Sequence, residues 1–125
     1  MFTHVVVGTN DLDKSRTFYD ATFAVLGIDP APPGDRAFYR SPGGSFMVTH
    51  PVNGEPASFA NGGTIGFAMA NAEQCKAWHD AGVAAGGKSC EDPPGYRDLA
   101  IGKTYLAYLR DPYGNKLCGL VMPGA

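Results

Sequence analysis

The sequence predicts an α+β fold built from two similar β-α-β-β modules, residues 1–60 and 61–125, within one domain over residues 1–125. Three observations predict it. The chain holds 17 glycines and 10 prolines, which suits a turn-rich strand protein better than a helical bundle. Short β-branched, apolar segments alternate with two longer segments of helical periodicity. The same order of elements then restarts after residue 60.

The first module is predicted from its turn and cap residues. Its expected elements are, in order, a strand (2–8), a helix (12–26) and a hairpin (37–40 and 45–50). Asn10 or Asp11 can cap the first turn of the helix, and Gly27 can end it. The proline-rich segment 28–36 is expected to be a loop.

The second module repeats this order with a longer connection. Its expected elements are a strand (64–70), a helix (72–85), an irregular segment (88–103) and a hairpin (103–110 and 116–121). Gly86 and Gly87 can end the helix. Each module can gain one further strand from its loops.

A direct comparison of the two halves supports the repeat. A shift of 60 places Phe18 on Trp78 and Gly27 on Gly87, and a shift of 70 places Val48 on Cys118. The second half therefore carries ten extra residues between its helix and its hairpin. Chance similarity between two short α+β segments is the alternative. The coincidence of helix face, final glycine and hairpin turn favours a repeat.

Alternation along the first strand of each module predicts an open face. Side chains of a strand point alternately to opposite faces, so the bulky residues pack under the helix. His4 and Thr64 then lie on the opposite face, beside small residues (Gly8, Gly66 and Ala68). We expect a small ligand to bind on this face.

Charge and cysteine content exclude several classes of protein. The net charge is −2 and the ten Lys and Arg residues are scattered, so we expect binding neither to nucleic acid nor to a membrane surface. The apolar runs are too short to span a bilayer, and no signal peptide is visible. Three widely spaced cysteines without a CxxC pattern favour a reducing, cytoplasmic location.

Three segments resemble the vicinal oxygen chelate superfamily, which includes glyoxalases, bleomycin-resistance proteins and extradiol dioxygenases. These segments are HVVVGTNDLDKSRTFYDATFAVLG, GGTIGFAMANAEQCKAWHDAG and YLRDPYGNKLCGL. The resemblance covers nearly the whole chain, and its most specific part is the turn at 111–115. It implies two βαβββ modules that form a cupped, mixed sheet with the helices on the outer face. It also implies a small-molecule ligand or substrate and a homodimer.

The same resemblance implies a divalent metal bound by one residue from each of four strands. Carried over to this sequence, the four positions are His4, Val48, Thr64 and Cys118, of which only His4 is the usual ligand type. Val48 and Thr64 would then line the ligand site. A trio of His4, His50 and Cys118 could in principle hold zinc. Otherwise His50 is hydrogen-bonded or solvated, and the cofactor stays unknown.

Other residues are candidates for binding or catalysis. His4 could act as a general base or as a hydrogen-bonding group in the cavity. Cys118 could be a reactive thiol or a small buried side chain. In the inserted segment, Arg97 could bind a carboxylate or phosphate of a ligand, or pair with Asp98 or Glu91. Tyr96 or Tyr105 could stack on a ligand or donate a hydrogen bond, and Tyr105 could assist His4 in catalysis.

These residues and the family resemblance leave three functions open. The first is a metal-dependent lyase, isomerase or dioxygenase that acts on a small oxygenated molecule through an unorthodox His and Cys site. The second is a binding protein of the bleomycin-resistance type that sequesters a molecule without chemistry. The third is a metal-free acid–base enzyme that uses His4.

Overall fold

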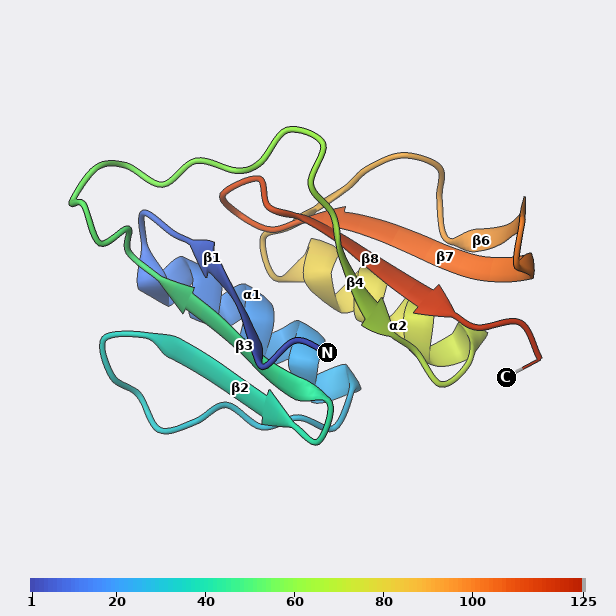
Figure 1. Cartoon of the computed structure of the whole chain (residues 1–125), viewed down its shortest axis with the longest axis horizontal. Helices are drawn as coiled ribbons and strands as arrows, with labels where there is room; N and C mark the ends of the chain where they lie inside the picture. Colours follow the sequence, from blue (N-terminus) through green and yellow to red (C-terminus); the bar gives the residue numbers. More distant parts are fainter. Residues whose placement is uncertain (125) are drawn as a thin grey trace.

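The computed structural model describes residues 1–124 and contains two helices and eight strands (Figure 1). The elements are β1 (His4–Gly8), α1 (Leu12–Val25), β2 (Ala37–Ser41), β3 (Gly44–Thr49), β4 (Ile65–Ala68), α2 (Ala72–Ala84), β5 (Lys88–Ser89), β6 (Gly95–Leu99), β7 (Gly102–Arg110) and β8 (Lys116–Val121). The α+β class is confirmed. Within residues 1–124 neither helix is long and apolar enough to cross a membrane.

The first module forms a three-stranded sheet in the order β1-β3-β2. β1 is parallel to β3, and β2 is antiparallel to β3. The Asp11 carboxylate caps α1, because it accepts hydrogen bonds from the backbone amides of Asp13 and Lys14 at 3.1 and 3.2 Å. The proline-rich segment adds only one isolated bridge, between Pro30 and Tyr39. Prolines at 30, 32 and 33 lack the N–H groups that a further strand would need.

The second module forms a five-stranded sheet in which the order is β4-β8-β7-β5, and β6 also pairs with β7. The expectation of an irregular segment over residues 88–103 is therefore wrong in part. β7 is nine residues long, and this length lets its outer edge pair first with β5 and then with β6. The two prolines of the segment, Pro93 and Pro94, lie between these short strands, where no ladder hydrogen bond is required.

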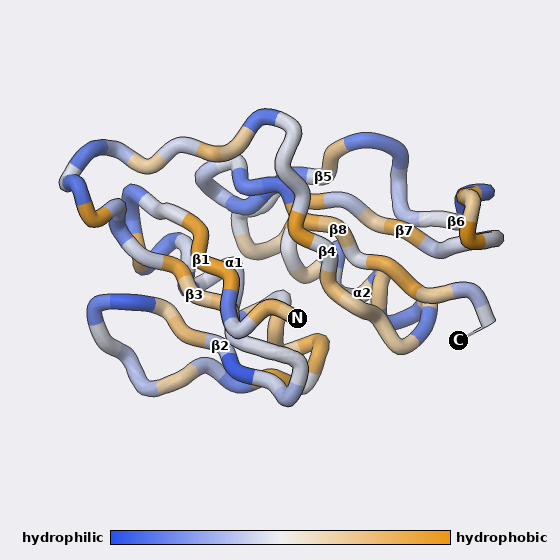
Figure 2. Tube along the Cα trace, in the orientation of Figure 1, coloured by the Kyte–Doolittle hydropathy of each residue, from blue (hydrophilic) through white to orange (hydrophobic). Residues whose placement is uncertain are grey.

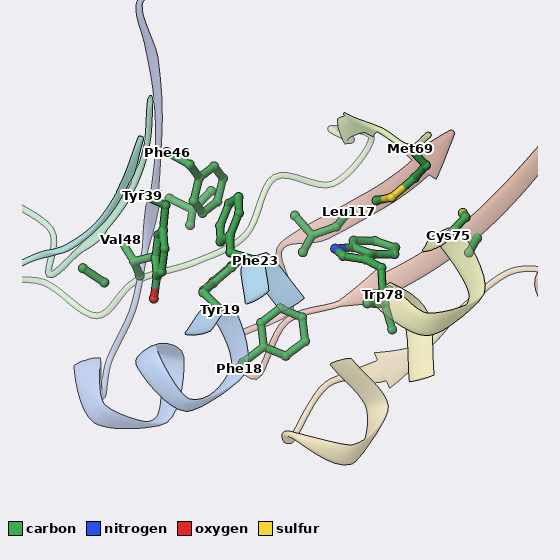
Figure 3. Close-up of a cluster of buried hydrophobic side chains, with 14 of the residues drawn as sticks. Phe18, Tyr19, Phe23, Tyr39, Phe46, Val48, Met69, Cys75, Trp78 and Leu117 are labelled. Carbon is green, nitrogen blue, oxygen red and sulfur yellow. The ribbon is translucent and has the colours of Figure 1, made fainter. Parts of the chain in front are cut away.

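The core lies between the sheets and the two helices. Rings of Phe23, Tyr39 and Phe46 gather on the side of the first module, and Trp78 and Leu117 lie on the side of the second (Figure 3). The Phe23 and Tyr39 rings stack with their centroids 4.5 Å apart. Apolar segments concentrate in the strands, and polar segments in the connecting loops (Figure 2).

Buried polar contacts join the two modules. Tyr19 on α1 donates a hydrogen bond of 2.6 Å to Asp111, which is only 3% exposed in the β7–β8 turn. Asn115 in the same turn donates to the backbone carbonyl of Gly8 at 3.2 Å and to Asp111 at 2.7 Å. Burial, followed by the Asp111 carboxyl, holds the pKa of Tyr19 well above its ordinary value. The β7–β8 turn therefore fixes how the first module sits against the second.

Candidate functional site

Both helices cover the same side of the two sheets and leave the other side open (Figure 1). In the first sheet His4 is paired with Ser45, and Val6 with Met47, so these four residues share the open face. In the second sheet Gly66 is paired with Cys118, and Cys118 with Tyr108. These three residues share the open face of the second module. The expected placement of His4 and Gly66 opposite the helices agrees with this register.

Val48 does not belong to the site, which corrects the sequence prediction. It is fully buried on the helix side of β3. Arg40 pairs with Ser45, but Arg110 pairs with Lys116, so the second hairpin has a turn that is one residue longer. The counterpart of Cys118 is therefore Met47, since a slip of one residue moves a side chain to the other face of the sheet.

One cavity lies between the facing edges of β1 and β4 and has a volume of about 300 Å³. Its apolar wall includes Phe23, Tyr39, Phe46 and Phe67. Its other residues come from the N-terminal segment, the end of α1, the β2–β3 turn and β4; they are Phe2, His4, Val5, Leu26, Ile28, Ser41, Gly43, Gly44, Ser45, Ile65, Gly66 and Ala68. No Asp, Glu, Lys or Arg is among these lining residues. We call this cavity the β1–β4 cleft.

Two lining residues define how a ligand could meet the cleft. His4 is exposed, and its Nδ1 lies 2.8 Å from the Thr3 hydroxyl oxygen, so the other ring nitrogen is the one free for a ligand. A Cβ atom added at Gly66 would have no neighbour within 4 Å. The cleft thus has an apolar wall, free space beside Gly66, and the His4 imidazole among its lining residues.

The predicted metal residues do not come together. Ser45 lies beside His4, and His50 follows five residues later, roughly 16 Å further along the sheet. Thr64 precedes β4 and lines a different hollow with Gly8 and Lys116. No three His, Cys, Asp or Glu side chains in residues 1–124 are placed to hold a metal ion. The trio of His4, His50 and Cys118 is therefore not assembled within one chain.

Tyr105 and Tyr96 lie on the helix side of the second sheet, so neither faces His4 across the open face. They are register partners whose ring centroids lie 5.1 Å apart in an edge-to-face arrangement. Tyr105 packs against the hydrophobic core, and this burial is the main reason why its pKa is raised. The charges of Lys76 and Asp80 on α2 also act on it. The predicted pairing of His4 with Tyr105 is wrong.

Arg97 serves the backbone of the inserted segment. Its guanidinium donates to the carbonyl oxygens of Gly95, Leu106 and Asp92, each at 2.9 Å. The expected alternative, a pair with Glu91, is replaced by an ion pair between Glu91 and Lys116. Arg97 therefore holds the 90–94 loop in place, and its guanidinium already donates three hydrogen bonds within the protein.

The open face of the second module holds residues that the sequence reasoning missed. The Lys116 ammonium lies 5.2 Å from the centroid of the Tyr108 ring and pairs with Glu91. Cys118 lies beside Tyr108, and burial raises the pKa of its thiol. A raised pKa keeps this sulfur protonated near neutral pH and lowers its reactivity. The parity of the hairpin, counted from Arg110 and Lys116, could have shown that Tyr108 and not Tyr105 shares a face with Cys118.

Comparisons with known proteins agree with this architecture. The sequence model of the Glyoxalase/Bleomycin resistance protein/Dioxygenase superfamily matches residues 1–118. The crystal structure of a glyoxalase/bleomycin resistance protein from Albidiferax ferrireducens T118 is 57% identical, with a TM-score of 0.93. That match covers 97% of this chain and 98% of the other.

More distant structures share the fold. A glyoxalase-related enzyme from Fulvimarina pelagi is 19% identical with a TM-score of 0.76, and the match covers 98% of this chain and 88% of that one. Lactoylglutathione lyase from Agrobacterium tumefaciens is 21% identical with a TM-score of 0.64, over 97% of this chain and 92% of that one. No protein of curated function matches the sequence.

Proposed function

The chain belongs to the glyoxalase/bleomycin resistance protein/dioxygenase superfamily, and on that basis we propose that it binds a small, largely apolar molecule in the β1–β4 cleft. One observation carries the proposal. A cavity of about 300 Å³ has an aromatic wall and no Asp, Glu, Lys or Arg among its lining residues. Small-molecule sites are typically concave and apolar, with few polar groups to fix orientation. His4, Ser41 and Ser45 supply such polar groups here.

The donor set of one chain does not fit a resident divalent metal. His4 is the single imidazole lining the cleft, and the other polar side chains among the lining residues are the hydroxyls of Tyr39, Ser41 and Ser45. Hard divalent ions and zinc bind through several carboxylates, imidazoles or thiolates. We therefore favour binding or sequestration without metal chemistry. A metal-dependent lyase, isomerase or dioxygenase remains the second function, and it would need donors from a second chain.

The proposal includes a homodimer and a cytoplasmic location. Phe2 and Val6, 73% and 46% exposed, place apolar surface beside the cleft that a second copy could cover. The cysteines at 75, 90 and 118 are free, which suits a reducing compartment. Light scattering on the purified chain tests the dimer, and a monomeric mass at micromolar concentration would contradict it.

Fluorescence titration with two related dyes tests the cleft. N-phenyl-1-naphthylamine is neutral, and 1-anilinonaphthalene-8-sulfonate carries the same rings with an added sulfonate. Because no cationic Lys or Arg lines the cleft, we expect the neutral dye to bind at least about tenfold more tightly. We expect an excess of chelator to leave this affinity unchanged. Tighter binding of the sulfonate, or loss of binding with chelator, would contradict the proposal.

A matched pair of glycine variants locates the binding. Gly66→Leu adds a side chain at the cleft where the native backbone has no neighbour within 4 Å, so it should fill the site without strain. Gly34→Leu makes the same change at an equally open position in the proline-rich loop. We expect Gly66→Leu to weaken the neutral dye at least about tenfold and Gly34→Leu to leave it within about twofold. Equal affinities in the two variants would place the dye elsewhere.

A further inference from the structure

A second group of chemically capable side chains lies on the helix side of the second sheet, away from the β1–β4 cleft. His79 on α2 is 7% exposed, and its two ring nitrogens both have partners. Nε2 lies 2.8 Å from the hydroxyl oxygen of Ser89 on β5, and Nδ1 lies 3.1 Å from a carboxylate oxygen of Asp80. The order is hydroxyl, imidazole, carboxylate, which is the arrangement that activates a serine for nucleophilic attack.

The partners of Asp80 determine which ring nitrogen of His79 carries the proton. Hydrogen bonds from Lys76 and then His79 lower the pKa of the Asp80 carboxyl. Lys76 Nζ lies 2.6 Å from the second oxygen of this carboxylate. An ionised carboxylate only accepts, so in the neutral imidazole Nδ1 of His79 carries the proton and Nε2 presents a lone pair. The Ser89 hydroxyl therefore donates to Nε2, as a general base requires.

The position of Ser89 makes its hydroxyl accessible. β5 is the outermost strand of its sheet, and Ser89 is exposed. The backbone amide of the next residue, Cys90, donates to Tyr108 on β7 at 3.3 Å. Because amides of an antiparallel strand point alternately toward and away from the partner strand, the Ser89 N–H points to the free edge. It can donate to an oxyanion that forms on a group attached to the Ser89 oxygen.

We propose that Ser89, His79 and Asp80 form a reactive site, separate from the β1–β4 cleft, that accepts an acyl or phosphonyl group from small activated esters and fluorides. The Ser89 oxygen attacks the electrophilic carbon or phosphorus, and its proton moves to Nε2 of His79. The bond to the leaving group breaks, and His79 returns the proton to that group. Water hydrolyses an acyl-serine by the reverse sequence, with His79 again as the base. The site lies at an open sheet edge, so it suits small, reactive substrates.

Labelling with an alkyl fluorophosphonate tests this site, because the reagent marks activated serines and leaves a stable adduct. The intact protein is labelled first and then digested, and mass spectrometry of the peptides measures the label on each serine separately. We expect Ser89 to be labelled at least about tenfold faster than Ser58, which is exposed in the loop after β3. Ser89→Ala should abolish the main adduct, and Ser58→Ala should leave the Ser89 rate unchanged.

A second variant separates activation from simple exposure. Asp80→Asn removes the charge that holds the His79 tautomer, at a side chain 54% exposed, so the fold should persist. We expect at least about a tenfold slower reaction at Ser89 with an unchanged melting temperature. Asp98→Asn, on exposed β6 of the same sheet, should leave the rate unchanged. Labelling of Ser89 no faster than Ser58, or a rate unaffected by Asp80→Asn, would overturn the proposal.

Discussion

The two modules repeat one order of elements, yet they differ in what they add to it. The first has three strands and a proline-rich loop, whereas the second has five strands and an inserted loop (residues 90–94). The repeated part forms the core and the facing edges β1 and β4. The inserted part carries Glu91, which pairs with Lys116 of β8, and the short strand that holds Ser89. Repetition thus builds the scaffold of this fold, and insertion supplies its chemical asymmetry.

The hairpin turns of the two modules should differ most in their effect on stability. The repeat aligns Ser41 with Asp111, but Ser41 only donates to the Gly44 carbonyl at 3.3 Å in an exposed turn. Asp111 accepts hydrogen bonds from the Tyr19 hydroxyl, the Asn115 amide group and two backbone amides. We expect Asp111→Ala to lower the free energy of unfolding by about 3 kcal/mol or more, and Ser41→Ala by less than about 1 kcal/mol.

Urea denaturation of both variants measures this difference. Tyr19→Phe serves as an intermediate, because it removes one of the partners of Asp111 and keeps the ring. If Asp111→Ala and Ser41→Ala lower the free energy of unfolding equally, the β7–β8 turn contributes no more to stability than the β2–β3 turn does. That result would contradict its role in joining the modules.

The helices should differ at a second pair of matched positions. Thr22 on α1 corresponds to Gly82 on α2, and a Cβ at Gly82 would lie 2.5 Å from Leu109 and 3.1 Å from Phe18. Alanine favours a helix over glycine by about 1 kcal/mol, but overpacking a core costs about 1–3 kcal/mol. We therefore expect Gly82→Ala to destabilise the protein by about 1 kcal/mol. Thermal unfolding beside Gly82→Ala/Leu109→Val checks this, since the smaller valine should recover part of the loss.

The smallest effect is expected at the ion pair that only the second module has. Lys116 and Glu91 are 21% and 46% exposed, so solvent weakens their attraction. We expect Glu91→Gln to change the free energy of unfolding by less than about 1 kcal/mol and to respond to salt less than the native protein does. A decrease of more than about 2 kcal/mol in the free energy of unfolding would instead show that the 90–94 loop contributes to global stability.

The sequence predicted the regular, local parts of the fold well. Asp11 and Gly27 bound α1 because caps act within one turn of the chain. The open face of β1, with His4, followed from alternation together with the internal repeat. The errors arose where a count of one residue matters. Because the turn of the second hairpin is one residue longer, the sequence comparison aligned Val48 with Cys118, whereas the structure aligns Met47 with it. A shift of one residue also decides that Tyr108, and not Tyr105, lies on the same face as Cys118.

Other features depend on contacts between distant segments. The pairing of β6 with β7 cannot be read from the 88–103 segment, because its composition resembles a loop and only the edge of β7 orders it. The relay from Asp80 through His79 to Ser89 joins a helix to a strand across Gly86 and Gly87. The β1–β4 cleft forms between strands that lie about sixty residues apart in the sequence.

The edges of β1 and β4 face each other without forming one ladder, since β1 pairs only with β3 and β4 only with β8. Within a ladder, neighbouring strands are fixed at about 4.8 Å by their hydrogen bonds. Here the width of the gap is set by side-chain contacts: the packing of α1 on α2, the Tyr19–Asp111 hydrogen bond, and the contacts of the Phe67 ring with Phe23 and Phe46. Substitutions at the α1–α2 contact or at Tyr19 and Asp111, none of which lines the cleft, can therefore change its width while its lining residues stay the same.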